Sequence, residues 1–209
     1  MSVALIDIGI GNLHSAEKAF VRMAEGRQPI HVTADPEVVR RADRVVLPGD
    51  GAFPACRRAL AEVPGLEEAV LEAVRAGKPL FGICVGMQLL ASVGHEFETV
   101  EGLGLIPGEV VRIAPADRAL KVPHMGWNDL VVTGSHPVLA GVATGDHAYF
   151  VHSWHFRVAD PAHRLAYVEY RDEVTAIVGR DNVVATQFHP EKSQATGLRM
   201  IQNFLEWRP

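Results

Sequence analysis

The sequence predicts an α/β fold in which a mixed sheet is flanked by helices. Two observations carry this prediction. Up to about residue 92, short apolar runs rich in β-branched side chains alternate with segments of helical periodicity, which is typical of βαβ units around a parallel sheet. Beyond that point, strand candidates follow one another closely, with turn residues between them. No repeat or linker marks a boundary, so we expect a single domain over residues 1–209.

In the first part of the chain, apolar runs predict strands and helical periodicity predicts helices. The expected strands cover residues 3–8, 29–32, 44–47 and 79–83, and the expected helices cover residues 15–25, 36–42, 55–62 and 66–76. Parallel strands joined by such helices end along one edge of the sheet, and functional loops gather there. The segments that follow these strands are therefore the first candidates for a site.

The second part of the chain begins with an expected helix at residues 86–92. Strands are expected at residues 110–113, 130–132, 148–151, 165–170, 174–178 and 183–187, and a last helix at residues 196–205. These strands are closely spaced and separated by turn residues rather than helices. The sheet should therefore be mixed, with a β-rich second half.

Composition and charge exclude several classes of function. The formal net charge is −5 and the sequence pI is about 6.0, so the chain lacks the basic surface that nucleic acid binding requires. Residues 1–12 lack the features of a signal peptide and no apolar run is long enough to cross a membrane, so we expect a cytoplasmic location and no membrane partner. The two cysteines, Cys56 and Cys84, are expected to be free thiols.

The segment Gly82-x-Cys84-x-Gly86 follows an apolar strand and precedes a helix, as in a nucleophile elbow that carries a thiol. A tight strand-to-helix turn exposes its central residue at the edge of the sheet, and the flanking glycines allow neighbouring backbone to come close. The start of the next helix favours a thiolate and offers the Val85 N–H to a developing oxyanion. From this segment alone, a buried structural cysteine is the alternative.

A second candidate segment, His189-Pro190-Glu191, lies over a hundred residues further along. Pro190 disfavours helix at His189, and residues two apart in an extended segment face the same side, so the carboxylate can meet the imidazole. In such a pair Glu191 fixes the tautomer of His189, and His189 takes the thiol proton and returns it to the leaving amine. The triplet is a weak signal alone, but with the elbow it predicts a Cys84–His189–Glu191 catalytic triad.

No cofactor or metal is expected. His152 and His155 are spaced like possible ligands, but residues three apart in a strand face opposite sides, and the sequence has neither H-E-x-x-H nor a cysteine pair. Residues 9–14 begin like a dinucleotide-binding loop but place His14 where the third glycine belongs, and no P-loop motif is present. Cys56 has no base motif nearby and is expected to contribute to helix packing.

The elbow and the His-Pro-Glu segment resemble the triad class of glutamine amidotransferase domains, which hydrolyse the side-chain amide of glutamine through a cysteinyl thioester. The resemblance covers the whole chain. Residues 6–15, 47–53, 123–128 and 149–153 look like segments of the glutaminase subunits of imidazole glycerol phosphate synthases, which serve histidine biosynthesis. The resemblance implies a single-domain, flavodoxin-like mixed sheet with a class I glutamine amidotransferase elbow.

The resemblance implies further roles at matching positions. The oxyanion hole matches Gly49, Asp50, Gly51 and the amide of Val85, and the glutamine-binding positions match Gln88, Glu96, Ser153 and Trp154. Glu96 would bind the α-ammonium group of glutamine. This chain departs from the usual pattern at Ile8, Asp50 and Trp154, where tyrosine, valine and tyrosine are usual. We expect the Asp50 carboxylate to point away from the oxyanion, leaving the main chain usable.

The resemblance also implies a partner protein. A loop that faces the synthase subunit, at the mouth of an ammonia passage, matches Pro123, His124, Met125, Gly126, Trp127 and Asn128. The implied partner is a (β/α)8-barrel cyclase, and the heterodimer makes imidazole glycerol phosphate and aminoimidazole carboxamide ribonucleotide. The glycines of residues 48–51 would allow a peptide flip by which the partner controls the oxyanion hole.

Three alternatives stay open from the sequence. The chain could be the glutaminase subunit of another synthase, such as those for anthranilate, aminodeoxychorismate or guanylate, although residues 123–128 argue against this. It could be a cysteine amidase or peptidase that acts alone, or a non-catalytic scaffold with an inherited pocket. High activity of the isolated chain would favour the stand-alone hydrolase.

Overall fold

The computed structural model describes residues 1–11, 13–114 and 121–209. In chain order its strands and helices are β1 (Val3–Ile6), α1 (Leu13–Ala24), β2 (Ile30–Thr33), α2 (Pro36–Arg41), β3 (Arg44–Gly49), α3 (Phe53–Glu62), α4 (Leu66–Arg75), β4 (Leu80–Cys84), α5 (Val85–Gln88), β5 (Val93–Gly94), β6 (Val100–Glu101), β7 (Gly108–Arg112), β8 (His124–Val132), β9 (His147–His152), β10 (Trp154–Val158), β11 (Arg164–Tyr170), β12 (Asp172–Arg180), β13 (Val183–Thr186) and α6 (Gln194–Glu206). Short 3-10 helices are η1 (Pro137–Leu139), η2 (Pro161–His163) and η3 (Pro190–Lys192). Within the described residues, no helix is long and apolar enough to cross a membrane.

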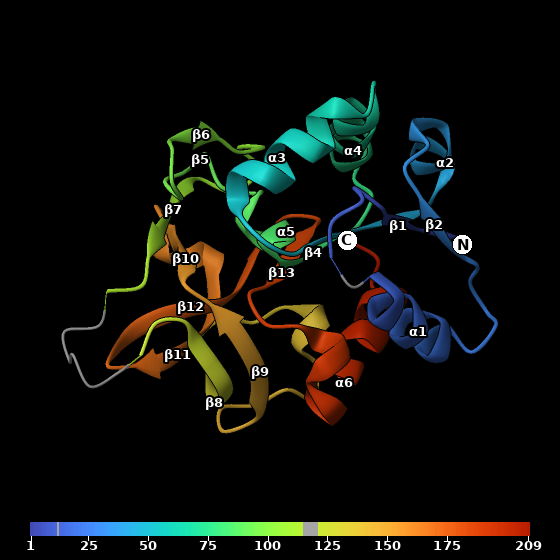
Figure 1. Ribbon diagram of the computed structural model, residues 1–209. Coiled ribbons are helices and arrows are strands. Elements are labelled where there is room, and N and C mark those ends of the chain that lie inside the picture. Colours follow the sequence, from blue (N-terminus) through green and yellow to red (C-terminus); the bar gives the residue numbers. More distant parts are fainter. Residues whose placement is uncertain (12, 115–120) are drawn as a thin grey trace.

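The main sheet forms the centre of the molecule (Figure 1). Among the described residues it has nine strands in the order β2-β1-β3-β4-β13-β12-β11-β8-β9. The strands from β2 to β13 pair in parallel, whereas β12, β11, β8 and β9 are added antiparallel. Every residue of β4 is buried, as expected for a central parallel strand covered on both faces. The predicted mixed α/β sheet is confirmed.

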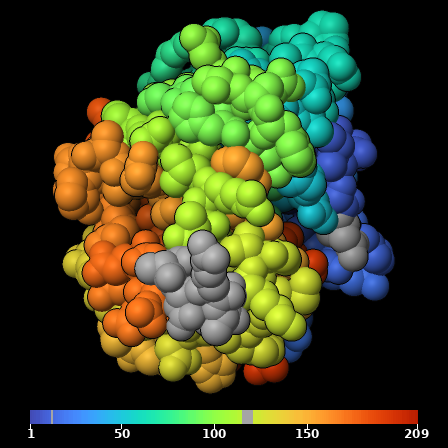
Figure 2. Space-filling model, turned by 60° about the vertical axis from the view of Figure 1, so that its left-hand side comes forward, coloured from blue at the N-terminus to red at the C-terminus, as the bar shows by residue number. Residues whose placement is uncertain are grey.

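A second, smaller sheet has the order β10-β7-β5-β6 in the part of the chain that the structure describes. β5, β6 and β10 are absent from the sequence predictions, because two-residue strands show no periodicity and β10 follows β9 after a single residue. The helix predicted over residues 86–92 instead ends at Gln88. The carbonyls of Leu89 and Leu90 accept hydrogen bonds from Leu103 and Ile106 rather than from a continuing helix. Figure 2 shows the side of the molecule that carries the smaller sheet, with the green residues of the β5–β6 region above yellow-green and orange residues.

Helices cover both faces of the parallel half of the sheet (Figure 1). α1 and α6 lie together on one face, and α2, α3 and α4 lie on the other. Phe20 of α1, Phe81 of β4 and Phe204 of α6 form an aromatic cluster, with ring centroids 5.2 to 6.3 Å apart. This cluster joins the two helices to the buried strand that ends in Cys84.

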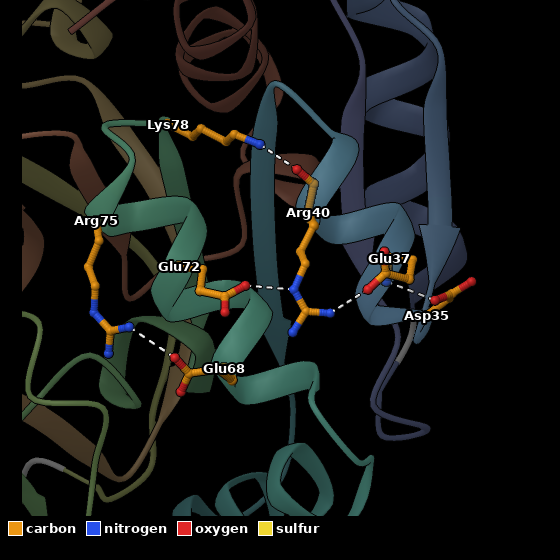
Figure 3. Close-up of polar contacts among 7 residues, drawn as sticks. All are labelled: Asp35, Glu37, Arg40, Glu68, Glu72, Arg75 and Lys78. Atoms are coloured by element: carbon orange, nitrogen blue, oxygen red, sulfur yellow. Dashed lines mark hydrogen bonds and ion pairs between the residues drawn. The ribbon is translucent and has the colours of Figure 1, made fainter.

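An ion-pair network joins α2 to α4 on the outer surface (Figure 3). The Arg40 guanidinium bonds to the carboxylates of Glu37 and Glu72, at 2.6 Å each, and the Lys78 ammonium donates to the Arg40 carbonyl at 2.6 Å. Asp35 caps the start of α2 by accepting from the Glu37 N–H at 2.8 Å. Exposed pairs of this kind contribute little free energy each. We therefore infer that the network fixes the position of α2 relative to α4 rather than adding much to the stability of the fold.

Arg44 ties the start of β3 to the end of α6 from a buried position. Its Nε donates to the carbonyl of Phe204 at 3.1 Å, and its Nη2 donates to the carbonyl of Trp207. Carbonyls at the end of a helix lack further helical partners. The Trp207 N–H also donates to the Phe204 carbonyl, at 3.3 Å, so the guanidinium adds a second donor there and supplies a charged donor to the Trp207 carbonyl.

We expect Arg44→Ala to lower the free energy of unfolding by about 2–4 kcal/mol, because two carbonyls lose a charged donor. Urea denaturation followed by circular dichroism measures this change. Arg41→Ala, at the exposed end of α2, is the matched control and should change the free energy by less than about 0.5 kcal/mol. Equal destabilisation by the two substitutions would contradict the anchoring role of Arg44.

Candidate active site

Cys84 is the last residue of β4 and lies directly before α5. Its backbone φ of 55° and ψ of −115° are rare for a residue with a side chain, and such strain costs about 1–3 kcal/mol. A Cβ at Gly86 would lie 1.8 Å from the Leu47 carbonyl oxygen, and one at Gly82 would lie 2.9 Å from the Gly86 carbonyl oxygen. Only glycine fits at these two positions, and the elbow predicted from Gly82-x-Cys84-x-Gly86 is confirmed.

The sheet brings Cys84 and His189 together although they are 105 positions apart in the chain. β4 and β13 are parallel neighbours, with Ile83 opposite Thr186, so the chain that leaves β13 passes the end of β4. Nδ1 of His189 lies 2.8 Å from Oε1 of Glu191, and the Cys84 side chain interacts with the same ring. Because Nδ1 faces the carboxylate, Nε2 is the ring nitrogen available to the sulfur.

The charges around His189 favour its protonated form. Burial of the ring opposes protonation, but hydrogen bonds to Cys84 and Glu191, together with their charges, outweigh it and raise the pKa of His189 to about 10. The side chain of Glu191 is almost fully buried, and its Oε2 has no hydrogen-bond partner among the described residues. An imidazolium held in this way stabilises a neighbouring thiolate, which is the reactive form of cysteine.

A cavity of about 270 Å³ opens in front of Cys84. Its lining consists of Asp50, Gly51, Cys84, Val85, Gln88, Glu96, Pro123, Val151, His152, Ser153 and Trp154. All four residues predicted to bind glutamine line this cavity. Its mixed polar and apolar wall suits a small polar molecule.

The loop that follows β3 forms one wall of the cavity. Gly49 lies opposite Cys84 in the β3–β4 pair, so the loop begins beside the sulfur. The Asp50 carboxylate accepts from the Gly51 N–H at 2.8 Å, and the Asp50 carbonyl accepts from the Cys56 thiol at 3.1 Å. The structure therefore differs from the expectation that Asp50 leaves the main chain free, because its own carboxylate takes the Gly51 amide. Cys56 and Cys84 are both free thiols.

Two glutamine side chains connect the cavity wall to the sulfur. Nε2 of Gln88 donates to the Trp154 carbonyl and to Oε1 of Gln187, at 3.0 Å each, and Nε2 of Gln187 lies 3.9 Å from the Cys84 sulfur. Gln187 is absent from the sequence predictions. The signal for it was its place two residues before His189, since residues two apart in an extended segment share a side.

Glu96 also contacts the chain near the cavity. Its Oε2 accepts from the Phe53 N–H, at the start of α3, at 2.8 Å, which fixes the carboxylate at the cavity wall. The Ser153 carbonyl accepts from the Ile113 N–H at 2.9 Å, which holds the β9–β10 junction to the end of β7. Within the described residues, no three His, Cys, Asp or Glu side chains gather as a metal site would require.

The prediction of a loop at residues 123–128 is wrong: His124 to Asn128 belong to β8, which pairs antiparallel with β9. Side chains alternate along this strand. Met125 and Trp127 point outward and are 62% and 46% exposed, whereas His124 is buried on the inner face of the same strand. Pro123 lies just before the strand and Asn128 is half-buried. The six residues therefore share one strand region but not one face.

Comparisons with known proteins show which family the chain resembles. A family model described as glutamine amidotransferase class-I matches residues 4–207. The imidazole glycerol phosphate synthase subunit HisH of Cereibacter sphaeroides is 63% identical to this chain over 212 residues, and that of Ruegeria pomeroyi is 61% identical over 212 residues. Both alignments cover the whole of each chain.

Solved structures share the fold at low sequence identity. A crystal structure of a glutamine amidotransferase matches with a TM-score of 0.72 and 23% identity, over 98% of this chain and 97% of the other. The glutaminase domain of Trypanosoma brucei CTPS matches with a TM-score of 0.68 and 16% identity, over 100% and 95% of the two chains. The chain belongs to the class-I glutamine amidotransferase family and, within it, to the HisH subunits of imidazole glycerol phosphate synthase.

Proposed function

We propose that residues 1–209 form one glutaminase domain, which releases ammonia from L-glutamine and delivers it to a (β/α)8-barrel cyclase subunit. The ammonia is used there to make imidazole glycerol phosphate and aminoimidazole carboxamide ribonucleotide in histidine biosynthesis. The observation that carries the proposal is the elbow thiol of Cys84, which lines a polar cavity and interacts with the hydrogen-bonded pair of His189 and Glu191. Full-length similarity to HisH subunits supports the choice of partner.

The triad carries the reaction through a thioester. The Cys84 thiolate attacks the amide carbon of glutamine, and the resulting tetrahedral intermediate collapses as His189 protonates the nitrogen that leaves as ammonia. His189, now neutral, takes a proton from a water molecule that attacks the thioester. Collapse of the second intermediate releases glutamate and restores the thiolate beside the imidazolium. Glu191 holds Nδ1 of His189 throughout, so that Nε2 stays aimed at the reacting atoms.

Two amides are needed for the oxyanion of each intermediate. The Val85 N–H at the start of α5 is one donor. We assign the second to the main chain of Gly49, Asp50 and Gly51, after the loop changes conformation. The Asp50 carboxylate, bound to the Gly51 N–H, would repel an oxyanion, and glycines on both sides allow a peptide to reorient. The partner controls this change if it binds the rearranged loop better than the present one.

Substrate binding follows from the polar groups of the cavity wall. The Glu96 carboxylate suits the α-ammonium group of glutamine, and it is held near the cavity by Phe53. Both N–H groups of the Gln88 amide are taken by Trp154 and Gln187, so its oxygen is left to accept from the substrate. Ser153 and Trp154 contribute mainly backbone to the same wall.

An exposed apolar surface beside the cavity supports a protein partner. Met125, Trp127 and Val151 lie on the paired strands β8 and β9, with Met125 opposite Val151. The Trp127 ring packs edge-on against His147 and Tyr149, at 5.7 and 5.8 Å between centroids. Pro123 and Val151 belong to the cavity lining, so the surface adjoins the cavity wall. Tryptophan in this setting is typical of the centre of an interface.

We expect Cys84→Ala to reduce glutamate formation at least about ten-thousandfold, because the thioester route loses its nucleophile. A coupled glutamate assay of the complex measures this loss. The same complex should still form product from added ammonia, since the cyclase site is untouched. Cys56→Ser retains a donor for the Asp50 carbonyl and serves as the control, with activity within a few-fold of wild type. Glutamate release by Cys84→Ala near the wild-type rate would remove Cys84 as nucleophile.

We expect kcat of His189→Asn to be about 10- to 100-fold lower than kcat of Glu191→Gln. Loss of the orienting carboxylate still leaves His189 as the base, whereas His189→Asn removes the base itself. Steady-state glutaminase kinetics of both variants in the complex give the comparison. The reverse order would mean that the roles of base and orienting group are wrongly assigned.

We expect the isolated chain to be a poor glutaminase. The partner with its nucleotide substrate should stimulate glutamate release about a hundred- to a thousandfold, because one additional oxyanion donor changes the rate by about this factor.

We expect Trp127→Ala to weaken binding of the partner about 30-fold or more in titration calorimetry and to leave the basal rate of the free chain unchanged. Val32→Ala, an exposed apolar residue on β2 at the opposite edge of the sheet, is the control. A free chain that already runs at the stimulated rate would favour a stand-alone hydrolase.

A further inference from the structure

Two buried histidines, one on β8 and one on β9, lie between the cavity and the outer face of β8. His124 and His152 stand opposite each other in the β8–β9 pair and are 2% and 6% exposed. Nδ1 of His124 lies 3.0 Å from Nε2 of His152. Phe150 stacks on the His124 ring at 4.9 Å between centroids, and Tyr170 packs against it at 4.2 Å. Neither histidine has a part in the triad chemistry proposed above.

The hydrogen bonds of this pair can run in only one direction. The Trp154 carbonyl can only accept, so Nδ1 of His152, 2.8 Å away, must carry a proton. In a neutral ring Nε2 of His152 is then an acceptor, and the proton between the two rings belongs to Nδ1 of His124. Nε2 of His124 in turn accepts from Nδ2 of Asn128 at 3.2 Å. The bonds form a continuous chain from Asn128 to the Trp154 carbonyl.

The surroundings keep both rings neutral, which this arrangement requires. Burial lowers the pKa of His124 to about 4. Burial also lowers the pKa of His152 to about 3, helped by His124 and His155 and opposed by the bond to the Trp154 carbonyl. A proton on Nε2 of His152 would set two donors against each other between the rings.

The cavity end of the chain meets the glutamine-binding wall. The Trp154 carbonyl accepts from His152 and also from Nε2 of Gln88 at 3.0 Å, so both of its lone pairs are used. The second N–H of Gln88 goes to Gln187, which reaches the Cys84 sulfur. The position of the carbonyl and the orientation of the Gln88 amide therefore depend on His152.

The other end of the chain meets the exposed surface of β8. Nδ2 of Asn128 also donates to the Glu169 carbonyl on β11 at 3.1 Å, and its Oδ1 accepts from the Asp129 N–H at 2.8 Å. Asn128 follows Trp127 directly in the strand. A shift of β8 on partner binding would thus move the first donor of the chain.

We propose that His124 and His152 are positioning residues, a one-way hydrogen-bond relay through which strand β8 sets the Trp154 carbonyl and the Gln88 amide in the glutamine cavity. This inference rests on the proposed function of the cavity. It connects substrate affinity to the strand that carries Trp127, and it gives two histidines outside the triad a role in the reaction.

The tautomers of the two rings test the relay without turnover. Nitrogen NMR of the isotope-labelled free chain at pH 7, assigned with single-histidine variants, should show both rings neutral with the proton on Nδ1. A proton on Nε2 of either ring, or a charged ring at this pH, would overturn the relay.

Two substitutions of one residue separate positioning from packing. In His152→Asn the side-chain nitrogen occupies the place of Nδ1 and can still donate to the Trp154 carbonyl, whereas His152→Gln places its amide near the position of Nε2. In the complex with the cyclase, His152→Gln should raise KM for glutamine about five- to tenfold with kcat changed less than about twofold. His152→Asn keeps the donor to the Trp154 carbonyl but loses the bond to His124, so it should raise KM only about two- to threefold. Equal KM values for the two variants would overturn the positioning role. If the wild-type complex releases no glutamate, the proposed function fails, and the NMR measurement alone decides the relay.

Discussion

The candidate site depends on the parallel pairing of β4 with β3 on one side and with β13 on the other. In this register Gly49 lies opposite Cys84, and Thr186 lies opposite Ile83. The loop after β3, the elbow and the segment leading to His189 therefore leave the sheet along one edge. A slip of one residue in any of these strands would turn its side chains to the opposite face. The strained backbone of Cys84 is tolerated because β4 is buried and paired on both sides.

The same edge holds a buried charge, which is unfavourable unless its partners are fixed. The His189 ring lies between the Glu191 carboxylate and the Cys84 sulfur, and hydrogen bonds also hold the backbone of His189. The Ser193 hydroxyl donates to the His189 carbonyl at 2.7 Å and accepts from the Tyr149 N–H at 3.0 Å. Tyr149 belongs to β9, so the triad segment and the β8–β9 hairpin are joined by direct hydrogen bonds.

The paired strands β8 and β9 contact both the outer surface and the cavity wall, because their side chains alternate between two faces. Its outer face carries an apolar strip that begins beside the cavity, and its inner face carries the histidine pair that ends at the cavity wall. One strand pair therefore connects the apolar strip on the outer surface with the histidine pair at the cavity, because successive residues of a strand point to opposite faces. Without this alternation, two separate elements would have to be aligned with each other.

The alternating first half of the fold, the elbow at Cys84 and the pairing of His189 with Glu191 could all be predicted from the sequence. These features are local: glycine spacing, a proline and short-range periodicity act within a few residues. Three features became visible only in the folded chain: the second sheet, the strand at His124–Val132 in place of a loop, and the early end of α5 at Gln88. The same is true of the contact of Gln187 with the Cys84 sulfur, the hydrogen bond of the Gly51 amide to the Asp50 carboxylate, and the burial of His124. Each of these depends on pairing between residues far apart in the chain or on the choice of one among several possible hydrogen bonds, and local propensity carries no information about either.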